Sequence, residues 1–345
     1  MDLLIARNDR LGDFMLAWPA VQTVHRSLPD ARITLLAQGY TAPLAGLCAG
    51  VSAVATDPGM AGEWANARAL ARRVRPGGFD AALALFSRFD MALGLALARI
   101  PIRVAPATKL AQVFYTHRLR QHRSQSSRPE WLYNLELAEF FLARLGVSEP
   151  LRAAAPYLSF PAREVAETRL RLAQRLDIEP NRPWVFMHPG HGGSSPTLPA
   201  ELFARVGREL AGEGAVLVLS EGPSDLEAVL AVSEQLGDTP HVRYRSLSGL
   251  EAYARDLAAV DLFVSGSTGP LHVAGALDVA TAAFYPHRRS ASATRWQTLN
   301  SEERRLSFMP PPQAAENDFA AIDMDAAMTQ IKSFLSRNTR ANPNS

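Results

Sequence analysis

The 345-residue sequence has little cysteine, little lysine and no long uninterrupted apolar run. Its one cysteine, Cys48, excludes a disulfide framework and a cysteine-based zinc site, and it favours a reducing compartment. The most apolar stretch, residues 79–102, is interrupted by Arg88, Asp90 and Arg99 and is not expected to cross a bilayer. The opening residues have neither the basic start nor the apolar core of a secretion signal. We therefore expect a soluble, cytoplasmic protein.

Basic charge is concentrated in one part of the chain, although the formal net charge is only +2. Residues 68–128 carry eleven Arg and one Lys against two Asp, a local net charge of +10, which leaves −8 for all other residues. A solvated arginine-rich surface is the simplest interpretation, but a bias this large favours an anionic partner. Nucleic acid, anionic lipid and a carboxylated glycan all carry suitable charge. The segment lacks the interleaved aromatic residues of single-strand binders, so we expect no nucleic-acid partner.

Short apolar runs alternate with helical patterns along most of the chain, which predicts parallel sheets covered by helices on both faces. The predicted strands are residues 3–6, 33–37, 51–55, 81–86 and 102–105, then 184–187, 215–219, 262–265 and 282–285. The main predicted helices are residues 12–27, 64–74, 130–145, 199–211, 224–236, 247–257, 269–277 and 324–335. Residues 118–130 are polar and predict a mobile loop, and residues 148–163 contain three prolines and predict a linker.

The linker divides the sequence into an N-terminal domain, residues 1–155, and a C-terminal domain, residues 156–322. A last helix, residues 323–336, and a disordered tail, residues 337–345, are expected to follow. Ligands of parallel sheets bind beyond the carboxyl ends of the strands, so we expect the site in a cleft between the two domains.

A polar segment, residues 7–13, follows the first predicted strand and ends in Gly12 and Asp13 at the start of a helix. The dipole of the helix favours the ionised form of a carboxylate in its first turn. An ionised Asp13 in a cleft can act as a general base toward a hydroxyl. The alternative is that Asp13 only stabilises its helix, because acidic residues are common in first turns.

Two further loops combine glycine with hydroxyl groups ahead of a helix. Residues 188–195, His-Pro-Gly-His-Gly-Gly-Ser-Ser, follow one strand, and residues 265–272, Ser-Gly-Ser-Thr-Gly-Pro-Leu-His, follow another. Backbone N–H groups and hydroxyls at the start of a helix suit a phosphate, and Pro270 suits the first turn. His272 falls one turn later and is expected to face the cleft with Thr268, unless it is a half-buried, satisfied histidine.

The sequence predicts no metal site. The histidines of the first loop have no further ligands at a suitable spacing. Asp323 and Asp325 match the D-x-D pattern of some sugar-transferring enzymes, but they lie at the predicted start of the last helix, as an N-cap and a first-turn acid. Ser248 and Glu251 likewise form a capping-box pattern.

Together these segments resemble glycosyltransferase family 9, the ADP-heptose:lipopolysaccharide heptosyltransferases. The similarity is carried by Asn8-Asp9-Arg10-Leu11-Gly12-Asp13, by His188-Pro189-Gly190 with Gly192-Gly193-Ser194, and by Ser267-Thr268-Gly269-Pro270-Leu271-His272. Phe284-Tyr285-Pro286 and Arg295-Trp296 are also similar, and the resemblance runs from about residue 1 to residue 308. It implies an α/β fold of GT-B type, with two Rossmann-like parallel-sheet domains facing a central cleft. The first domain would bind the acceptor and the second the nucleotide-sugar.

The resemblance also implies inverting transfer without a metal or other cofactor. The donor would be a nucleotide-sugar, ADP-heptose, and the acceptor an anionic glycolipid, the inner core of lipopolysaccharide. Asp13 would be the catalytic base. The donor-binding residues would be His191, Gly192, Ser194, Ser195, Glu221, Ser248, Ser267, Thr268, Gly269 and His272. The acceptor-binding residues would be Asn8, Arg10, Gly12, Arg88, Lys109, Arg118 and Arg120. The basic first domain would also hold the enzyme at the cytoplasmic face of the inner membrane.

The sequence departs from the family pattern at two places. Ser267 stands where the family usually has Asp, and Ser195-Pro196-Thr197 lacks the usual Lys. One of the arginines between residues 288 and 295 could supply the missing cation. Three rival hypotheses stay open: a GT-B glycosyltransferase with a different nucleotide-sugar or acceptor glycan, a sugar-nucleotide epimerase that needs no basic domain, and a non-catalytic module that binds an anionic polymer.

Overall fold

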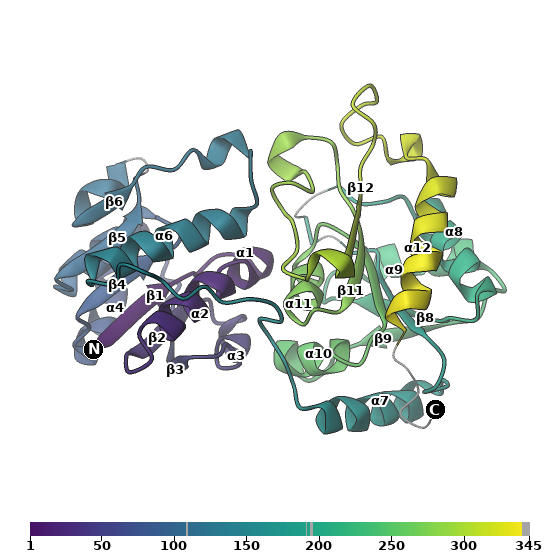
Figure 1. The fold of residues 1–345 in the computed structure, drawn as a ribbon, viewed down its shortest axis with the longest axis horizontal. Coiled ribbons are helices and arrows are strands. Elements are labelled where there is room, and N and C mark those ends of the chain that lie inside the picture. Colours follow the sequence, from purple (N-terminus) through teal and green to yellow (C-terminus); the bar gives the residue numbers. More distant parts are fainter. Residues whose placement is uncertain (108–109, 191, 194–195, 340–345) are drawn as a thin grey trace. The chain divides into compact units, whose positions relative to one another are not determined.

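The computed structural model describes residues 1–107, 110–190, 192–193 and 196–339, and the chain divides into two compact units (Figure 1). The first unit is Met1–Leu158 and the second is Ser159–Ser345, so the division falls just after the boundary expected at residue 155. Both units are α/β with a six-stranded parallel sheet. In the part of the chain that the structure describes, no helix is long and apolar enough to cross a membrane.

The sheet of the first unit has the strand order β3-β2-β1-β4-β5-β6, and all neighbouring strands are parallel. Its strands are β1 (Asp2–Ala6), β2 (Arg32–Ala37), β3 (Val51–Thr56), β4 (Ala81–Ala84), β5 (Ile102–Pro106) and β6 (His117–Leu119). Its α-helices are α1 (Leu11–Met15), α2 (Trp18–Ser27), α3 (Ala42–Ala45), α4 (Glu63–Val74), α5 (Phe89–Leu97) and α6 (Glu130–Arg144). β1 is central, with Leu3 beside Ile33 of β2 and beside Ala81 of β4.

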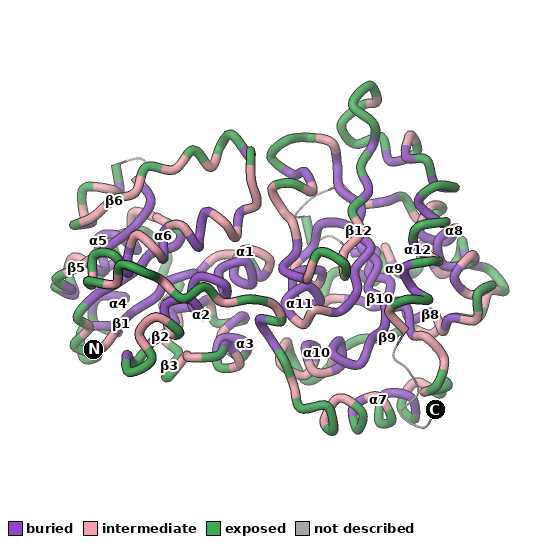
Figure 2. Tube along the Cα trace, viewed as in Figure 1, coloured by how far each residue is buried: buried purple, intermediate pink, exposed green. Residues whose placement is uncertain are grey.

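Helices cover both faces of this sheet. On one face, Leu4 of β1 belongs to a buried cluster with Leu70 of α4 and Met91 of α5. On the other face Leu3 and Ile5 are fully buried, and α2 and α6 pack against each other. Figure 2 shows the buried strands and the exposed outer sides of the helices. Two covered faces explain why the central strands are continuous apolar runs.

The second unit repeats this architecture with the strand order β12-β11-β10-β7-β8-β9, again fully parallel. Its strands are β7 (Trp184–His188), β8 (Val216–Glu221), β9 (His241–Arg245), β10 (Leu262–Gly266), β11 (Ala280–Phe284) and β12 (Arg305–Phe308). Its α-helices are α7 (Ala162–Leu176), α8 (Ala200–Gly212), α9 (Leu226–Leu236), α10 (Gly249–Leu257), α11 (Gly269–Ala276) and α12 (Met324–Asn338). Counted from the first strand of each unit, the two strand orders are the same.

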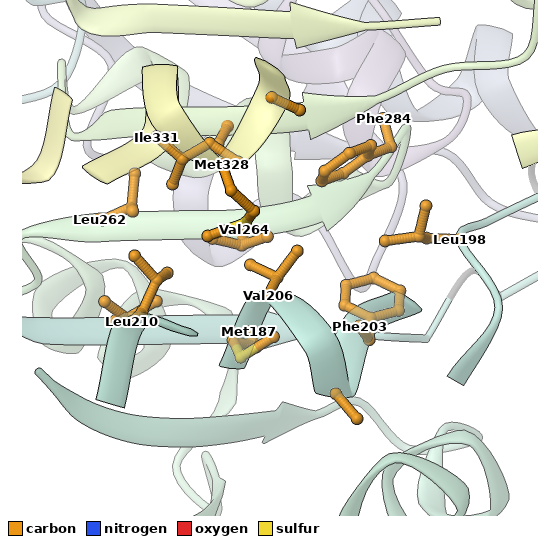
Figure 3. Packing of buried hydrophobic residues seen from close by; sticks show 14 of the residues in the cluster. Met187, Leu198, Phe203, Val206, Leu210, Leu262, Val264, Phe284, Met328 and Ile331 are labelled. Atoms are coloured by element: carbon orange, nitrogen blue, oxygen red, sulfur yellow. The ribbon is translucent and has the colours of Figure 1, made fainter. Parts of the chain in front are cut away.

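The core of the second unit joins one face of its sheet to α8 and α12 (Figure 3). Met187 of β7 and Val264 of β10 lie in one cluster with Phe203 of α8 and Ile331 of α12, and each is at most 1% exposed. The C-terminal helix is therefore part of this unit. As predicted, Asp323 caps it, because its carboxylate accepts a hydrogen bond from the Ala326 N–H at 3.0 Å.

One predicted helix, residues 12–27, is wrong in its continuity. α1 ends at Met15 and α2 begins at Trp18. Pro19 occupies the first turn of α2 and has no N–H with which to continue the hydrogen bonds of α1. The candidate base Asp13 therefore lies in a separate short helix.

Several elements have too weak a sequence signal to be predicted. The strands β6, β9 and β12 lie at sheet edges and carry Arg or His, so they form no apolar run. Because β12 follows later in the chain, the prediction that residues 282–285 form the last strand is wrong. α5 is apolar on nearly all sides and shows no helical period, and α7 buries only a narrow stripe. The expected mobile loop, residues 118–130, is wrong at its start, where β6 pairs with β5. Its remainder is tied down, because Gln121 donates to the Tyr133 carbonyl and to Glu136 at 2.8 and 2.6 Å.

Each sheet contains one place where the strand order reverses. In the first unit β1 and β4 are neighbours, and in the second unit β7 and β10 are neighbours. The loops that leave the carboxyl ends of such a pair run to opposite sides of the sheet, which opens a crevice where ligands of Rossmann-type sheets bind. The polar motifs noted in the sequence follow these strands.

Candidate active site

A buried arginine organises the reversal point of the first unit. Arg7 follows β1, is 2% exposed, and donates from Nε to Asp9 at 2.8 Å and from Nη2 to Asp13 at 2.6 Å. Its remaining nitrogen, Nη1, donates to Asn134 Oδ1 of α6 at 3.1 Å and to the Leu85 carbonyl after β4 at 3.4 Å. Asn134 and the Leu85 carbonyl therefore hold the Arg7 guanidinium in place, and the guanidinium in turn positions two carboxylates at the carboxyl ends of the strands.

The electrostatics of this cluster follow from its burial. The neighbouring carboxylates of Asp9, Asp13 and Glu130 outweigh the effect of burial and raise the pKa of Arg7 above its ordinary value, so the guanidinium stays charged. Burial raises the pKa of Asp9 to about 6, with Arg7 opposing the shift and Asp13 adding to it. Burial thus favours the protonated form of Asp9 in mildly acidic solution.

Asp13 is placed in the first turn of α1, as predicted, and its side chain is 22% exposed. Only Oδ1 is engaged by Arg7, and Oδ2 has no partner among the described residues. A fixed carboxylate with one open oxygen has the geometry that a general base needs to accept a proton from a bound hydroxyl. Asp13 was expected from the sequence, but the role of Arg7 was not, because an arginine directly after a strand usually lies in solvent.

The candidate acceptor residues are only partly brought together. Asn8 is buried and donates to Asp57, which follows β3, and its Oδ1 has no partner among the described residues. Asn66 donates to Asp57 at 3.0 Å and to Asp90 at 2.8 Å, and Asp90 in turn binds Arg88 after β4. This network links the loops that follow β1, β3 and β4.

The other acceptor candidates lie outside that network. Arg10 is exposed at the N-cap of α1, and Gly12 is in α1 itself. Arg118 and Arg120 are exposed on and just beyond the edge strand β6. Lys109 lies outside the described residues.

At the reversal point of the second unit, Thr268 caps α11 and accepts a hydrogen bond from the Leu271 N–H at 3.4 Å. Gly269 is the first residue of this helix, and Ser267 precedes the cap and is buried. Pro270 has no N–H and the Leu271 N–H binds the cap, so the Gly269 N–H is the donor that remains in the first turn, at the carboxyl end of β10. This arrangement suits a diphosphate, as the sequence predicts.

His272 is fully buried in α11 and is not the half-buried, satisfied histidine of the alternative interpretation. It is 1% exposed and packs edge-on against Trp296 with ring centroids 6.4 Å apart. Its Nδ1 has no partner among the described residues, and burial lowers its pKa to about 4. At neutral pH the ring is therefore uncharged and can only exchange hydrogen bonds with a ligand.

More polar atoms near this reversal point lack a partner among the described residues, namely His188 Nδ1 at the end of β7 and Thr197 Oγ1. Thr197 lies close over Gly266 of β10, where a Cβ would meet its Oγ1 at 2.6 Å. Buried polar groups are normally satisfied. Together with His272, these atoms indicate a place where a polar ligand supplies the missing hydrogen bonds.

Asp225 is a further polar residue of this site that sequence reasoning missed. Its carboxylate lies 3.4 Å from His188 Nε2 and accepts the Gly222 N–H at 2.9 Å. A Cβ on Gly190 would lie 2.0 Å from its Cγ, so glycine is required there. Asp225 thus connects the loop after β7 to the loop after β8. Gly190 and Gly222, which both lie against its carboxylate, were the sequence signal for this contact.

The candidate donor-binding residues Glu221 and Ser248 differ in their burial and in their contacts. Glu221 ends β8, is 9% exposed, and lies 3.4 and 4.0 Å from Arg243 and Arg245 of β9. Ser248 is exposed at the N-cap of α10, and the predicted capping box is wrong because its side chain makes no capping bond. Glu251 instead pairs with Arg255 at 2.9 Å.

The loop after β7 is described only in part. Gly192 and Gly193 have φ values of 51° and 69°, in the left-handed region that favours glycine. His191, Ser194 and Ser195 lie outside the described residues. Within the described residues no cluster of three or more His, Cys, Asp or Glu is arranged to hold a metal ion.

Comparison with known proteins now decides the family. The model of glycosyltransferase family 9 (heptosyltransferase) matches residues 67–314. A putative glycosyltransferase of Haemophilus influenzae is 34% identical over 337 residues, covering 96% of each chain. The chain belongs to glycosyltransferase family 9. Lipopolysaccharide heptosyltransferase 2 of Salmonella typhimurium, another relative, is 25% identical over 292 residues, covering 83% of this chain and 82% of that one.

Solved structures agree on the fold. A family 9 glycosyltransferase from Veillonella parvula has a TM-score of 0.81 at 17% identity, covering 97% of both chains. The ADP-heptose lipopolysaccharide heptosyltransferase II of E. coli has a TM-score of 0.77 at 20% identity, covering 98% of this chain and 99% of that one. The prediction of two Rossmann-like units of GT-B type is confirmed. As a member of family 9 the chain is a glycosyltransferase, which decides against the epimerase and the non-catalytic module.

The buried His272 of this glycosyltransferase predicts a pH effect on stability. A histidine whose pKa falls from 6.5 to about 4 on folding binds its proton more readily in the unfolded state, so stability is lost as pH falls from 6.5 to 4. At about 1.4 kcal/mol per unit, the loss is about 3 kcal/mol. Urea unfolding should therefore show that the difference in unfolding free energy between the parent chain and His272→Gln falls by about 3 kcal/mol as pH falls from 6.5 to 4. Parallel curves would contradict the assignment.

Proposed function

We propose that this chain is an inverting glycosyltransferase that moves a heptose or a related sugar from an ADP-sugar to the inner core of lipopolysaccharide, with Asp13 as the general base. The observation that carries the proposal is the fixed carboxylate of Asp13, held by Arg7 at the reversal point of the first unit with one oxygen open. The relatives named as lipopolysaccharide and lipooligosaccharide heptosyltransferases support the sugar and the acceptor. Solved E. coli structures described with ADP and with ADP-2-deoxy-2-fluoro heptose support the donor.

In the proposed reaction the acceptor hydroxyl gives its proton to Asp13 Oδ2 as its oxygen attacks the anomeric carbon of the donor. The new carbon–oxygen bond forms on the face opposite the diphosphate, so the configuration inverts. The bond from the anomeric carbon to the diphosphate breaks at the same time, and ADP leaves with the electron pair. No atom changes its oxidation state in this transfer. Negative charge develops on the leaving diphosphate.

The second unit would stabilise that charge. The Gly269 N–H at the start of α11 and an N–H of the neutral His272 ring would donate to phosphate oxygens. Arg295 is the proposed replacement for the family's usual Lys, since its guanidinium lies 5.4 Å from the Trp296 ring, which in turn packs on His272. Thr268 and Gly269 would fix the orientation of the diphosphate. The proposed transfer uses no metal ion.

The acceptor is proposed to be an anionic glycolipid. Arg88 is 41% exposed and keeps its position through Asp90, so part of its guanidinium can contact a carboxylate or phosphate of the acceptor. Arg118 and Arg120 extend the positive charge along the edge of the sheet. A cytoplasmic location remains a prediction.

A second candidate is a family 9 transferase with another nucleotide-sugar or acceptor glycan. It is favoured by Ser267 and Pro196, which stand where the family usually has Asp and Lys near the diphosphate. The two candidates share the fold and the base, and they differ in the nucleotide that the second unit prefers.

Calorimetric titration with ADP, UDP and GDP, without metal and then with magnesium, separates the candidates. We expect selective binding of ADP that does not need magnesium. In Arg295→Ala we expect ADP to bind about 10- to 100-fold more weakly, because a hydrogen bond to a charged group is lost. Arg163→Ala, a change of an exposed arginine on α7, is the matched control and should bind as the parent does. Preference for UDP or GDP would favour the second candidate, and unchanged binding in Arg295→Ala would exclude its role.

A further inference from the structure

One buried amide of the first unit has three polar partners. Asn134 belongs to the buried face of α6, which is otherwise mostly apolar, and it is 0% exposed. Its Oδ1 accepts hydrogen bonds from Arg7 Nη1 at 3.1 Å and from Arg123 Nη1 at 3.2 Å. Its Nδ2 donates to the Leu16 carbonyl at 3.0 Å. These bonds offset the cost of burying a polar side chain at this depth.

The partners of Asn134 determine the orientation of its amide. A guanidinium can only donate and a backbone carbonyl can only accept, so the amide oxygen must face the two arginines and the nitrogen must face Leu16. Leucine has nearly the same size but satisfies none of the three partners. An ionised aspartate could replace the oxygen but not the N–H. Asparagine is therefore the residue of this size that fits all three partners.

The Leu16 carbonyl lies where α1 ends. Leu16 is the C-cap of α1, and its N–H binds the Gly12 carbonyl at 3.0 Å. In a continuous helix its carbonyl would accept the Ala20 N–H, but that N–H binds the Ala17 carbonyl at 3.0 Å. Asn134 thus supplies a hydrogen bond that the break between α1 and α2 leaves unmade. A helix of five residues is not stable by itself, so it depends on such an anchor.

Both the side chain and the backbone of Asp13 depend on this amide. Arg7 binds Asp13 Oδ1 at 2.6 Å, and Asn134 holds the same guanidinium through Nη1. Without Asn134, Nη1 would keep the long bond of 3.4 Å to the Leu85 carbonyl. The backbone of Asp13 lies in α1, whose last turn Asn134 also holds through Leu16. One side chain therefore fixes the carboxylate from two directions.

We propose that Asn134 is a positioning residue for the candidate base Asp13, which it holds through the Arg7 guanidinium and through the last turn of α1. A general base must stay within hydrogen-bond reach of the hydroxyl, and a displacement of about 1 Å can cost about 100-fold in rate. Arg123 keeps the amide in place, since it also donates to Glu130, one turn earlier on α6, at 2.6 Å. The catalytic consequence rests on the proposed function, whereas the anchoring of α1 does not.

Hydrogen exchange, measured by mass spectrometry, tests the anchoring without any substrate. In Asn134→Leu the amides of residues 11–17 should exchange about tenfold faster than in the parent, the effect of one lost hydrogen bond on local opening. Asn300→Leu is the matched control, because Asn300 is a 3% exposed asparagine of the second unit that donates to the Val279 and Arg304 carbonyls. It should leave exchange at residues 11–17 unchanged. Parental exchange there in Asn134→Leu would overturn the proposal.

Kinetics separate positioning from general destabilisation. Transfer from ADP-heptose to a delipidated inner-core acceptor is measured below the melting temperature of each variant. Asn134→Leu should lower kcat about 100-fold and leave KM for both substrates unchanged, and Asn300→Leu should keep the parental kcat. In the Asp13→Asn background Asn134→Leu should lower kcat no further, because no base is left to position. Losses that multiply in the double variant would show a general structural defect and overturn the proposal.

The same variants distinguish failure of this proposal from failure of the proposed function. If Asp13→Asn loses turnover and Asn134→Leu keeps it, the positioning role of Asn134 is refuted and the base stands. If Asp13→Asn turns over as the parent does, the base is refuted, and the catalytic role of Asn134 is refuted with it. The hydrogen-exchange result then reports on the anchoring of α1 alone.

Discussion

Replacement of Asp13 by Asn is expected to lower turnover by about 10²–10⁴-fold, the usual contribution of a general base. The amide keeps the size of the side chain and can still meet Arg7 through its oxygen, but it cannot take the proton of the acceptor hydroxyl. The binding of ADP should be unchanged, because α11 and its cap Thr268 lie in the other unit. Initial rates at saturating donor and acceptor, with ADP titrated by calorimetry, check both statements.

Asp30→Asn is the control for this change, since Asp30 is an exposed aspartate of the same unit. Its turnover should equal that of the parent. If Asp13→Asn retained more than a tenth of the parental rate, Asp13 would only stabilise the start of α1, which is the simpler interpretation of its position. Asp9, the second carboxylate on Arg7, would then be the next residue to change.

Replacement of Arg7 by Met is expected to cost about 3–5 kcal/mol of stability, because it removes the buried guanidinium that binds both Asp9 and Asp13. For a unit of this size the melting temperature should fall by about 6–20 °C. Turnover should also be lost, since Asp13 no longer has a fixed position. Differential scanning calorimetry and initial rates measure the two effects.

Two comparisons make the Arg7 result specific. Arg32 pairs with Asp2 at 2.8 Å but is 74% exposed, so Arg32→Met should cost no more than about 1 kcal/mol. Arg7→Lys keeps the charge but cannot donate to both carboxylates and to Asn134 from one plane. It should fold better than Arg7→Met and still turn over slowly, with the loss in kcat rather than KM. A cost for Arg7→Met no larger than for Arg32→Met would show that the buried cluster is not a structural element.

The sequence predicts the central strands well and the edges poorly, for one physical reason. β1, β4, β7 and β10 are buried on both faces and are therefore largely apolar, so their sequences identify them as strands. Edge strands such as β9, with His241 and two arginines in five residues, need no such run. The helix α5 is difficult to predict for the opposite reason, because it is so apolar that its sequence shows no helical period.

The site is predictable where a motif is local and not where it depends on distant contacts. Thr268 and Asp13 follow strands and open helices, which the local sequence indicates. Arg7 becomes a buried anchor only because Asn134, 127 residues away, meets it through α6. In the same way the role of Asp225 depends on close contact with Gly190, which no local pattern contains.

The repeated strand order has a consequence for how such enzymes diversify. The two cores described above share no residue, since one lies within residues 4–115 and the other within residues 185–335. Substitutions that alter one half therefore need not disturb the packing of the other. Both departures from the family pattern, Ser267 and Pro196, fall in the second half. Evolution can in this way change which sugar is donated without changing the part of the enzyme that recognises the recipient.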